Sequence, residues 1–404
     1  MLNSIAYITA SSYLAAGLTI GLGAIGAALG EGYAAGLANE SISYKPKMSG
    51  ELLKNMLVGQ AIAESAAIFA LVVAILLLFA QPSSGSPIVA WSAIGAGLAM
   101  GLAAIGSGIG AGSPAGKACL AIVHQPSEKS RIMTTMLVGS AVCQTPAIFG
   151  MVISFLLMFM DFSSAPLYPA GAALLGAGLA TGLAAIGSGL GSGLPAGAAC
   201  LGIARQPKSG DKTMTTMLVG SAVCQTPAIF GIVISFLLIF MDFSSVPPYP
   251  GWAALLGAGL ATGLAAIGSG VGNGFTAMEA VSGTARNPEC NSETNRVMLI
   301  GMSVGQSTAI YGFLVSLLLV FTKMEPSTSL TSCLRLLGAG ISSGFGGIGP
   351  GIGLGIVAAS AVRWVARRPS STVALIRTML VGMAVTESTA IYALIVALLL
   401  LFVL

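Results

Sequence analysis

The chain has 404 residues, of which 55% are hydrophobic and only 7% carry a charged side chain. An ordinary soluble domain has about a quarter charged residues, so the 17 basic and 13 acidic side chains here are too few to cover a water-soluble fold of this length. Lipid is therefore the expected solvent, whereas the formal net charge of +4 excludes little by itself.

Long apolar segments follow in chain order. The N-terminal region has neither a basic stretch nor a small-residue cleavage site, so we expect residues 11–36 to be the first membrane span and not a signal peptide. Five later segments of 25 or 26 residues contain at most one Glu each, and about 20 apolar residues suffice to cross a bilayer. They are residues 56–80, 136–160, 217–241, 297–321 and 379–404.

The same unit recurs five times along the chain. Gly101, Gly182, Gly263 and Gly344 are spaced by 81 residues, and Gly21 lies 80 residues before the first of them. Each unit has a glycine-rich helix, a polar loop with a proline, an apolar helix and a short linker rich in Pro and Ser. This predicts an all-α membrane protein of ten transmembrane helices in five tandem hairpins, with boundaries at 1–82, 83–165, 166–247, 248–328 and 329–404.

The first helix of each unit is unusually rich in glycine. Glycine costs up to about 1 kcal/mol in an ordinary helix, but in membranes small residues allow helix backbones to approach closely. We therefore expect the five first helices to crowd together as an inner layer. A nucleotide-binding interpretation is weak, because these glycines lie inside membrane spans and do not follow a strand.

The basic residues gather on one side of the predicted membrane. Fifteen of the 17 Lys and Arg lie in or beside the five loops that join first and second helices. This bias places the loops in the cytoplasm and both termini outside. The scattered basic residues lack an aromatic stacking platform, so we do not expect a nucleic-acid partner. The six cysteines are expected to be free, buried thiols.

Polar side chains occupy equivalent positions in the middle of the five second helices. Glu64 and Glu387 hold this position in repeats one and five. A carboxylate inside the membrane is costly enough to be a functional hypothesis by default. Gln144, Gln225 and Gln306 hold the position in the middle repeats and cannot exchange a proton. We expect the glutamates to carry an ion and the glutamines to be structural.

These units resemble the c subunit, or proteolipid, of F-type and V-type rotary ATPases over essentially the whole chain. The resemblance depends on the glycine-rich first helix, the mid-span carboxylate and the polar loop, where Arg205, Gln206 and Pro207 match the motif of that family. It implies a c-ring formed with other copies, loops that contact the central stalk, including Arg286 and Arg367, and a stator a-type subunit that supplies an arginine. It also implies a membrane-lipid environment, no cofactor and no catalysis in this chain.

Repeat five resembles the sodium-binding version of the family. The implied ligands beside Glu387 are the Ser388 hydroxyl and the Val385 carbonyl, with Thr389 and Tyr392 as supporting groups. Hard cations prefer such oxygen ligands. Repeat four has the same set without the acid.

Repeat one is a poorer match to the sodium site. It retains Glu64 and Ser65, but Phe69 replaces the tyrosine. On its first helix Glu31 occupies the position where the sodium family has a glutamine, and two interpretations stand. Glu31 either forms a two-carboxylate site or is a protonated hydrogen-bond donor. Sodium is favoured only slightly over protons.

The expected function is ion translocation by a rotor subunit of a rotary ATPase or ATP synthase in the bacterial cytoplasmic membrane. Only two of five hairpins carry an acid, which favours an ATP-driven pump. The alternative is a non-catalytic structural paralogue that assembles with single-hairpin c subunits. A channel or transporter is disfavoured because no discontinuous helix is indicated.

Overall fold

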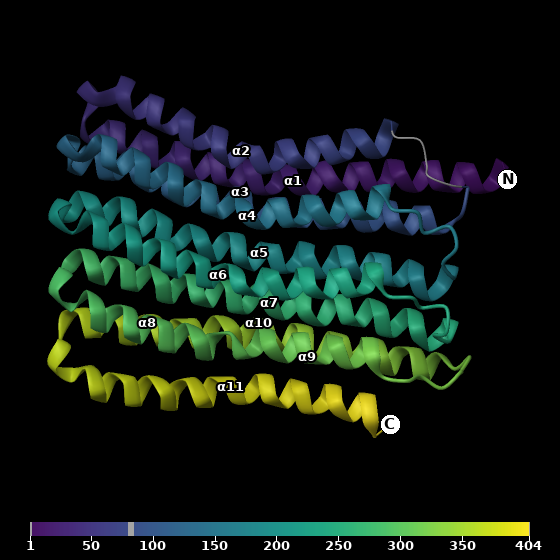
Figure 1. Cartoon of the computed structure of the whole chain (residues 1–404). Coiled ribbons are helices and arrows are strands. Elements are labelled where there is room, and N and C mark those ends of the chain that lie inside the picture. The colour runs from purple at the N-terminus through teal and green to yellow at the C-terminus, as the bar shows by residue number, and fades with distance from the viewer. Residues whose placement is uncertain (1, 80–84, 404) are drawn as a thin grey trace.

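The computed structural model describes residues 2–79 and 85–403, and the predicted linker at 81–84 lies outside these ranges. Within them, ten helices are long and apolar enough to cross a membrane. They pair into five antiparallel hairpins that lie side by side (Figure 1). The predicted all-α hairpin fold is confirmed.

The first helices of the hairpins are the longer set, with 37 to 43 residues. At 1.5 Å per residue a 37-residue helix is about 55 Å long, so it extends well beyond the hydrocarbon core of a bilayer. The set comprises α1 (Leu2–Tyr44), α3 (Ile88–His124), α5 (Leu167–Arg205), α7 (Pro248–Arg286) and α10 (Leu330–Arg367).

The second helices cover the first ones. Four of them are continuous helices of 31 residues: α2 (Ser49–Phe79), α4 (Lys129–Phe159), α6 (Gly210–Phe240) and α11 (Thr372–Phe402). The fifth is divided into α8 (Asn291–Gly305) and α9 (Ser307–Phe321). In several hairpins a serine hydroxyl on the second helix donates a hydrogen bond to a backbone carbonyl of the first helix. Ser154, for example, donates to the Ala96 carbonyl at 2.7 Å.

Each hairpin turns at the predicted proline. The residue before it leaves helical geometry, as Gln125 does at φ −138° and ψ 78°, because proline disfavours the α conformation of its predecessor. A short 3₁₀ turn then begins at the proline, and the second helix starts directly after it. All five basic loops lie at one end of the molecule, and both termini lie at the other (Figure 1).

Glycines bring the first helices into backbone contact. A Cβ added at Gly187 on α5 would lie 2.5 Å from the Cα of Ile267 on α7, closer than real Cβ contacts. Equivalent close approaches join α1 to α3, α3 to α5, and α7 to α10. The expected inner layer is therefore present, and at these contact glycines its packing leaves no room for larger side chains.

The break at Gln306 corrects our expectation of uninterrupted helices. It has a packing cause, since Gly305 has no side chain and leaves space for Asn273, whose Oδ1 lies 3.0 Å from where a Gly305 Cβ would be. Ser269 donates to the Gly305 carbonyl at 3.0 Å, which draws that carbonyl toward α7. The two half-helices remain in line (Figure 1).

Candidate functional site: the mid-membrane acid positions

Glu387 is paired with a residue of the preceding hairpin. Its carboxylate accepts a hydrogen bond of 2.6 Å from the Tyr311 hydroxyl on α9. Both side chains are partly buried, and 76 residues separate them in the sequence. A phenol that donates to a carboxylate in an apolar span makes a charge-assisted hydrogen bond, which is among the stronger kinds.

The glutamines at the equivalent position point the same way. Gln144 donates to the Ile62 carbonyl of α2 at 2.9 Å, and Gln225 donates to the Val142 carbonyl of α4 at 2.9 Å. In three hairpins, therefore, the mid-span side chain reaches back to the second helix of the hairpin before it. Gln144 and Gln225 therefore make hydrogen bonds between hairpins.

The other residues predicted at the Glu387 site make local hydrogen bonds or are exposed. The Ser388 hydroxyl donates to the Val385 carbonyl of its own helix at 2.7 Å, and Thr389 donates to Thr386 at 3.1 Å. Val385 is 69% exposed and Tyr392 is 62% exposed, because they face away from the preceding hairpin. The structure therefore puts Tyr311, and not Tyr392, against Glu387. The sequence contained the signal, since repeat four retains this tyrosine without an acid.

The acid of the first hairpin lies at the opposite edge of the molecule. Glu64 is exposed on α2, and the neighbouring Ser65 hydroxyl donates to the Ile62 carbonyl at 2.6 Å. Glu31 is half-buried on α1, and its backbone carbonyl accepts a hydrogen bond from Gln60 at 3.1 Å. The first hairpin thus holds two carboxyl groups on its two adjacent helices.

The position of Glu31 is filled differently in hairpins four and five. Leu354 is fully buried there on α10 and provides no oxygen. Asn273 is 1% exposed, and neither end of its amide has a hydrogen-bond partner in the described part of the chain. It lies beside Gly305 within its own hairpin. The hydrogen-bond donor to Glu387 is instead Tyr311 of α9.

The polar loops link neighbouring hairpins. Arg131 donates to the carbonyl of Pro207 at 3.0 Å, next to the predicted stalk-contact residues Arg205 and Gln206. The guanidinium of Arg367 lies 5.0 Å from the ring centre of Trp364. Arg286 lies near Arg367, Arg205 and Arg363, so this end of the molecule is strongly positive.

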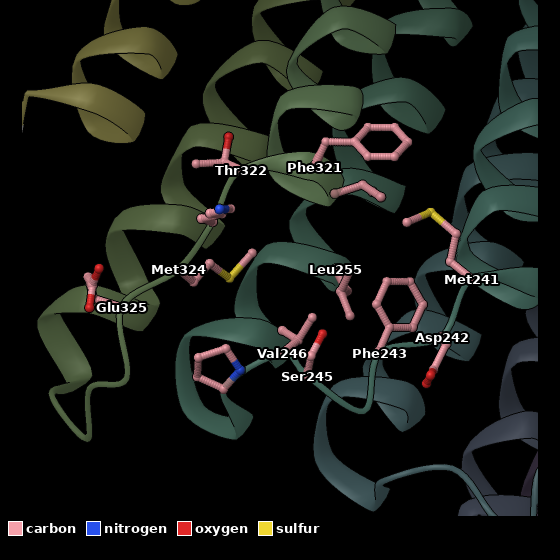
Figure 2. Close-up of a pocket in the computed structure, with 13 residues that line it drawn as sticks. Met241, Asp242, Phe243, Ser245, Val246, Leu255, Phe321, Thr322, Met324 and Glu325 are labelled. Atoms are coloured by element: carbon pink, nitrogen blue, oxygen red, sulfur yellow. The ribbon is translucent and has the colours of Figure 1, made fainter.

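A cavity of about 480 Å³ lies at the other end, between the linkers that follow α6 and α9 (Figure 2). Asp242, Lys323 and Glu325 are among its lining residues. Hydrogen bonds from the hydroxyl and backbone N–H of Ser244 hold the pKa of Asp242 below its usual range. Phe321 is 15 residues beyond Gln306, about 22 Å along a helix, so this cavity is separate from the acid positions.

The arrangement defines a class of protein: a membrane array of tandem hairpins with ionisable groups between neighbours at mid-span. Five segments match the family described as the C subunit of ATP synthase, at residues 14–77, 94–157, 175–238, 256–319 and 337–400. The chain belongs to this family.

Subunits of ATP synthases from other organisms are similar to parts of this chain. The K subunit of the A-type ATP synthase of Methanocaldococcus jannaschii is 34% identical over 228 residues, which cover 56% of this chain and 94% of that protein. The ATP synthase c subunit of Natranaerobius thermophilus is 42% identical over 85 residues, 21% of this chain and 98% of its own length. That of Petrotoga mobilis is 54% identical over 70 residues, 17% of this chain and 73% of its own length.

Proposed function

We propose that the chain is an ion-carrying rotor subunit of a rotary ATPase, with Glu387 and Glu64 as the carriers. The observation that supports this most directly is the hydrogen bond from Tyr311 to Glu387, which positions an ionisable group at mid-span between two hairpins. An isolated charge there is costly, so the carboxylate exposed to lipid is neutralised by a proton or a sodium ion. It releases that ion where the stator supplies an arginine and a path to water.

The three glutamine hairpins are proposed to be silent in transport. An amide keeps the contact between hairpins, as Gln144 does with Ile62, but it cannot bind and release a proton. With two acids in five hairpins, fewer ions cross per turn, while the ATP consumed per turn is fixed by the catalytic head. Each ATP then works against a steeper ion gradient, which suits a pump.

The carried ion is sodium or a proton, and the oxygen set around Glu387 slightly favours sodium. Hard cations take about six oxygens. Tyr311 and Ser307 lie one helical turn apart on α9, so they share the face toward Glu387. The Ser307 hydroxyl is buried beside the Tyr311 phenol, and it offers a further oxygen to a cation held by the Glu387 carboxylate.

Orientation and partners complete the proposal. The five basic loops lie in the cytoplasm of a bacterial cell, contact the central stalk through residues such as Arg205 and Arg367, and leave both termini outside. Other copies of the chain, lipid and a stator a-type subunit surround the hairpins.

The test is ion pumping by the assembled enzyme in vesicles. Glu387→Gln should abolish or severely impair pumping, because a neutral amide cannot exchange an ion. Gln225→Ala, the matched change at a proposed silent position, should leave pumping largely intact. Normal pumping by Glu387→Gln would refute the carrier role. The runner-up is a structural filler that assembles with single-hairpin c subunits, and it predicts that neither change matters.

A further inference from the structure

The cavity between the linkers that follow α6 and α9 has both charged and apolar lining residues. The charged ones are Asp242, Lys323 and Glu325, and all three are exposed. The apolar ones include Leu255, which is fully buried, and Val320, which is 7% exposed. Figure 2 shows Asp242 and Glu325 on opposite sides of the cavity, with Leu255 between them. A ligand that fills this cavity must therefore be amphipathic.

The position of the cavity along the membrane spans sets the depth of its two parts. The spans of the two second helices end at Phe240 and Phe321, and the three charged lining residues follow within four positions. Leu255 lies seven residues beyond Pro248, the first residue of α7, which is about 10 Å along the helix. The cavity therefore extends from the headgroup layer toward the hydrocarbon core, as a phospholipid does.

A matched cavity of about 400 Å³ lies between the linkers of hairpins two and three. Its lining residues are repeat equivalents, so that Phe162 corresponds to Phe243 of the larger cavity. In this matched cavity Asp242 and Ser244 hold the positions of Lys323 and Glu325. The larger cavity therefore combines a cation with two carboxylates, whereas the lining of the matched cavity has one carboxylate and no cation.

Lys323 is also unusual for its place in the chain. Because 15 of the 17 Lys and Arg lie in or beside the loops at the other end, a lysine here runs against the charge distribution. Lys323, Glu325 and Asp242 form no ion pair among residues 2–79 and 85–403. The Asp242 carboxylate is oriented by hydrogen bonds from the N–H and hydroxyl of Ser244, at 2.9 and 2.6 Å. Groups of both charges are thus available to a ligand.

We propose that this cavity binds the headgroup of a phosphatidylethanolamine molecule from the leaflet at this end of the spans. The Lys323 ammonium pairs with the lipid phosphate, and the carboxylates of Asp242 and Glu325 are the acceptors available to the lipid ammonium. The glycerol and the first acyl carbons lie against Leu255 and Val320. The cavity volume of about 480 Å³ is within the range of small-molecule sites, about 300–1,000 Å³.

The same groups discriminate against other headgroups. A primary ammonium has three N–H donors for carboxylate oxygens, whereas the trimethylammonium of phosphatidylcholine has none. The anionic headgroup of phosphatidylglycerol has no amine, so it leaves both carboxylates without a cation. Water-soluble phosphoethanolamine leaves the apolar part of the cavity uncovered. The proposal requires only a membrane environment and is independent of the ion carriers and of which side of the membrane the loops face.

The test is the retention of lipid by the purified, assembled protein. The protein is incubated in mild detergent with phosphatidylethanolamine, phosphatidylcholine and phosphatidylglycerol of identical acyl chains, and lipid retained after gel filtration is quantified by mass spectrometry. Loss of a hydrogen bond to a charged group changes an equilibrium roughly tenfold or more. Phosphatidylethanolamine should therefore be retained at least roughly tenfold more strongly than phosphatidylcholine.

Lys323→Asp combined with Glu325→Ser gives this cavity the residues of the matched one, and it should lower phosphatidylethanolamine retention roughly tenfold or more. Both changes are at exposed linker positions, so the fold should be kept. Met324→Trp should reduce retention in the same way, because it fills the cavity without changing its charge. Asp161→Ser is the control, since Asp161 is the repeat equivalent of Lys323 but lines neither cavity.

Three results would overturn the proposal. One is equal retention of the three lipids by the unmodified chain, and another is unchanged phosphatidylethanolamine retention in the double variant. The third is displacement of the lipid by free phosphoethanolamine at a similar concentration, because the headgroup alone would then be the ligand. Retention that falls in the double variant and in Met324→Trp, but not in Asp161→Ser, supports the site.

Discussion

Replacing one interior glycine with alanine tests the packing of the inner layer. A Cβ at Gly193 would lie 2.7 Å from the Cα of Gly110, whereas carbon atoms in contact normally stay about 3.5–4.0 Å apart. The clash is between two backbones, so α3 and α5 must separate by about 1 Å. Overpacking of this kind costs about 1–3 kcal/mol. Gly193→Ala should therefore lower the free energy of unfolding by the overpacking cost, reduced by the stabilisation that the helix preference of alanine provides.

Gly32→Ala is the matched control, because Gly32 is the equivalent position in hairpin one and has space for a Cβ within the described part of one chain. Both variants gain the same helix preference, up to about 1 kcal/mol, so their difference isolates the overpacking cost. The assay is unfolding of single chains in mild detergent by titration with sodium dodecyl sulfate. A Gly193→Ala chain as stable as Gly32→Ala would refute the packing argument.

Two further predictions address orientation and the ion. Cysteines at Ser209 and Ser370 in the basic loops should react only with a membrane-permeant reagent, whereas a cysteine at Ser164 should react from outside; labelling of the loops by an impermeant reagent in intact cells would reverse the topology. Sodium at neutral pH should slow carbodiimide labelling of Glu387, and Ser307→Ala should reduce this protection more than Thr386→Ala does; equal rates with and without sodium would indicate protons.

Most of the fold was predictable because its determinants are local or periodic. Apolar length marks each span, the proline after Gln206 marks a turn, and the 81-residue spacing sets the number of hairpins. Glycine density also predicts close helix contact without knowledge of the partner. These signals do not depend on which face of a hairpin meets its neighbour.

Which residue contacts Glu387 could not be predicted in the same way. Val385, Ser388 and Tyr392 share a helix with Glu387, and the resemblance to the sodium-binding version of the family implied them as its ligands and supporting groups. The actual partner depends on the direction in which successive hairpins are placed, which brings Tyr311 across from the preceding one. The break at Gln306 was missed for a similar reason, since it depends on how Asn273 packs beside Gly305.

In each hairpin an aromatic residue lies five positions after the mid-span residue, and Tyr311 contacts the mid-span residue of the next hairpin. This arrangement bears on the proposed number of ions moved for each ATP consumed. A phenylalanine before a glutamine removes a hydroxyl that would have no carboxylate to receive it, and the amide then satisfies itself on a backbone carbonyl, as Gln225 does on Val142. Such a junction is neutral at all times and can face lipid without carrying an ion. Tyr311 instead provides a hydroxyl donor to Glu387, which under the proposed function alternates between charged and neutral forms. Under the proposed function, each chain carries ions at hairpins one and five and has three neutral hairpins between them. Under the proposed function, a stator arginine would have no carboxylate to attract across these three hairpins, so ATP hydrolysis would have to drive rotation through them, as in a pump.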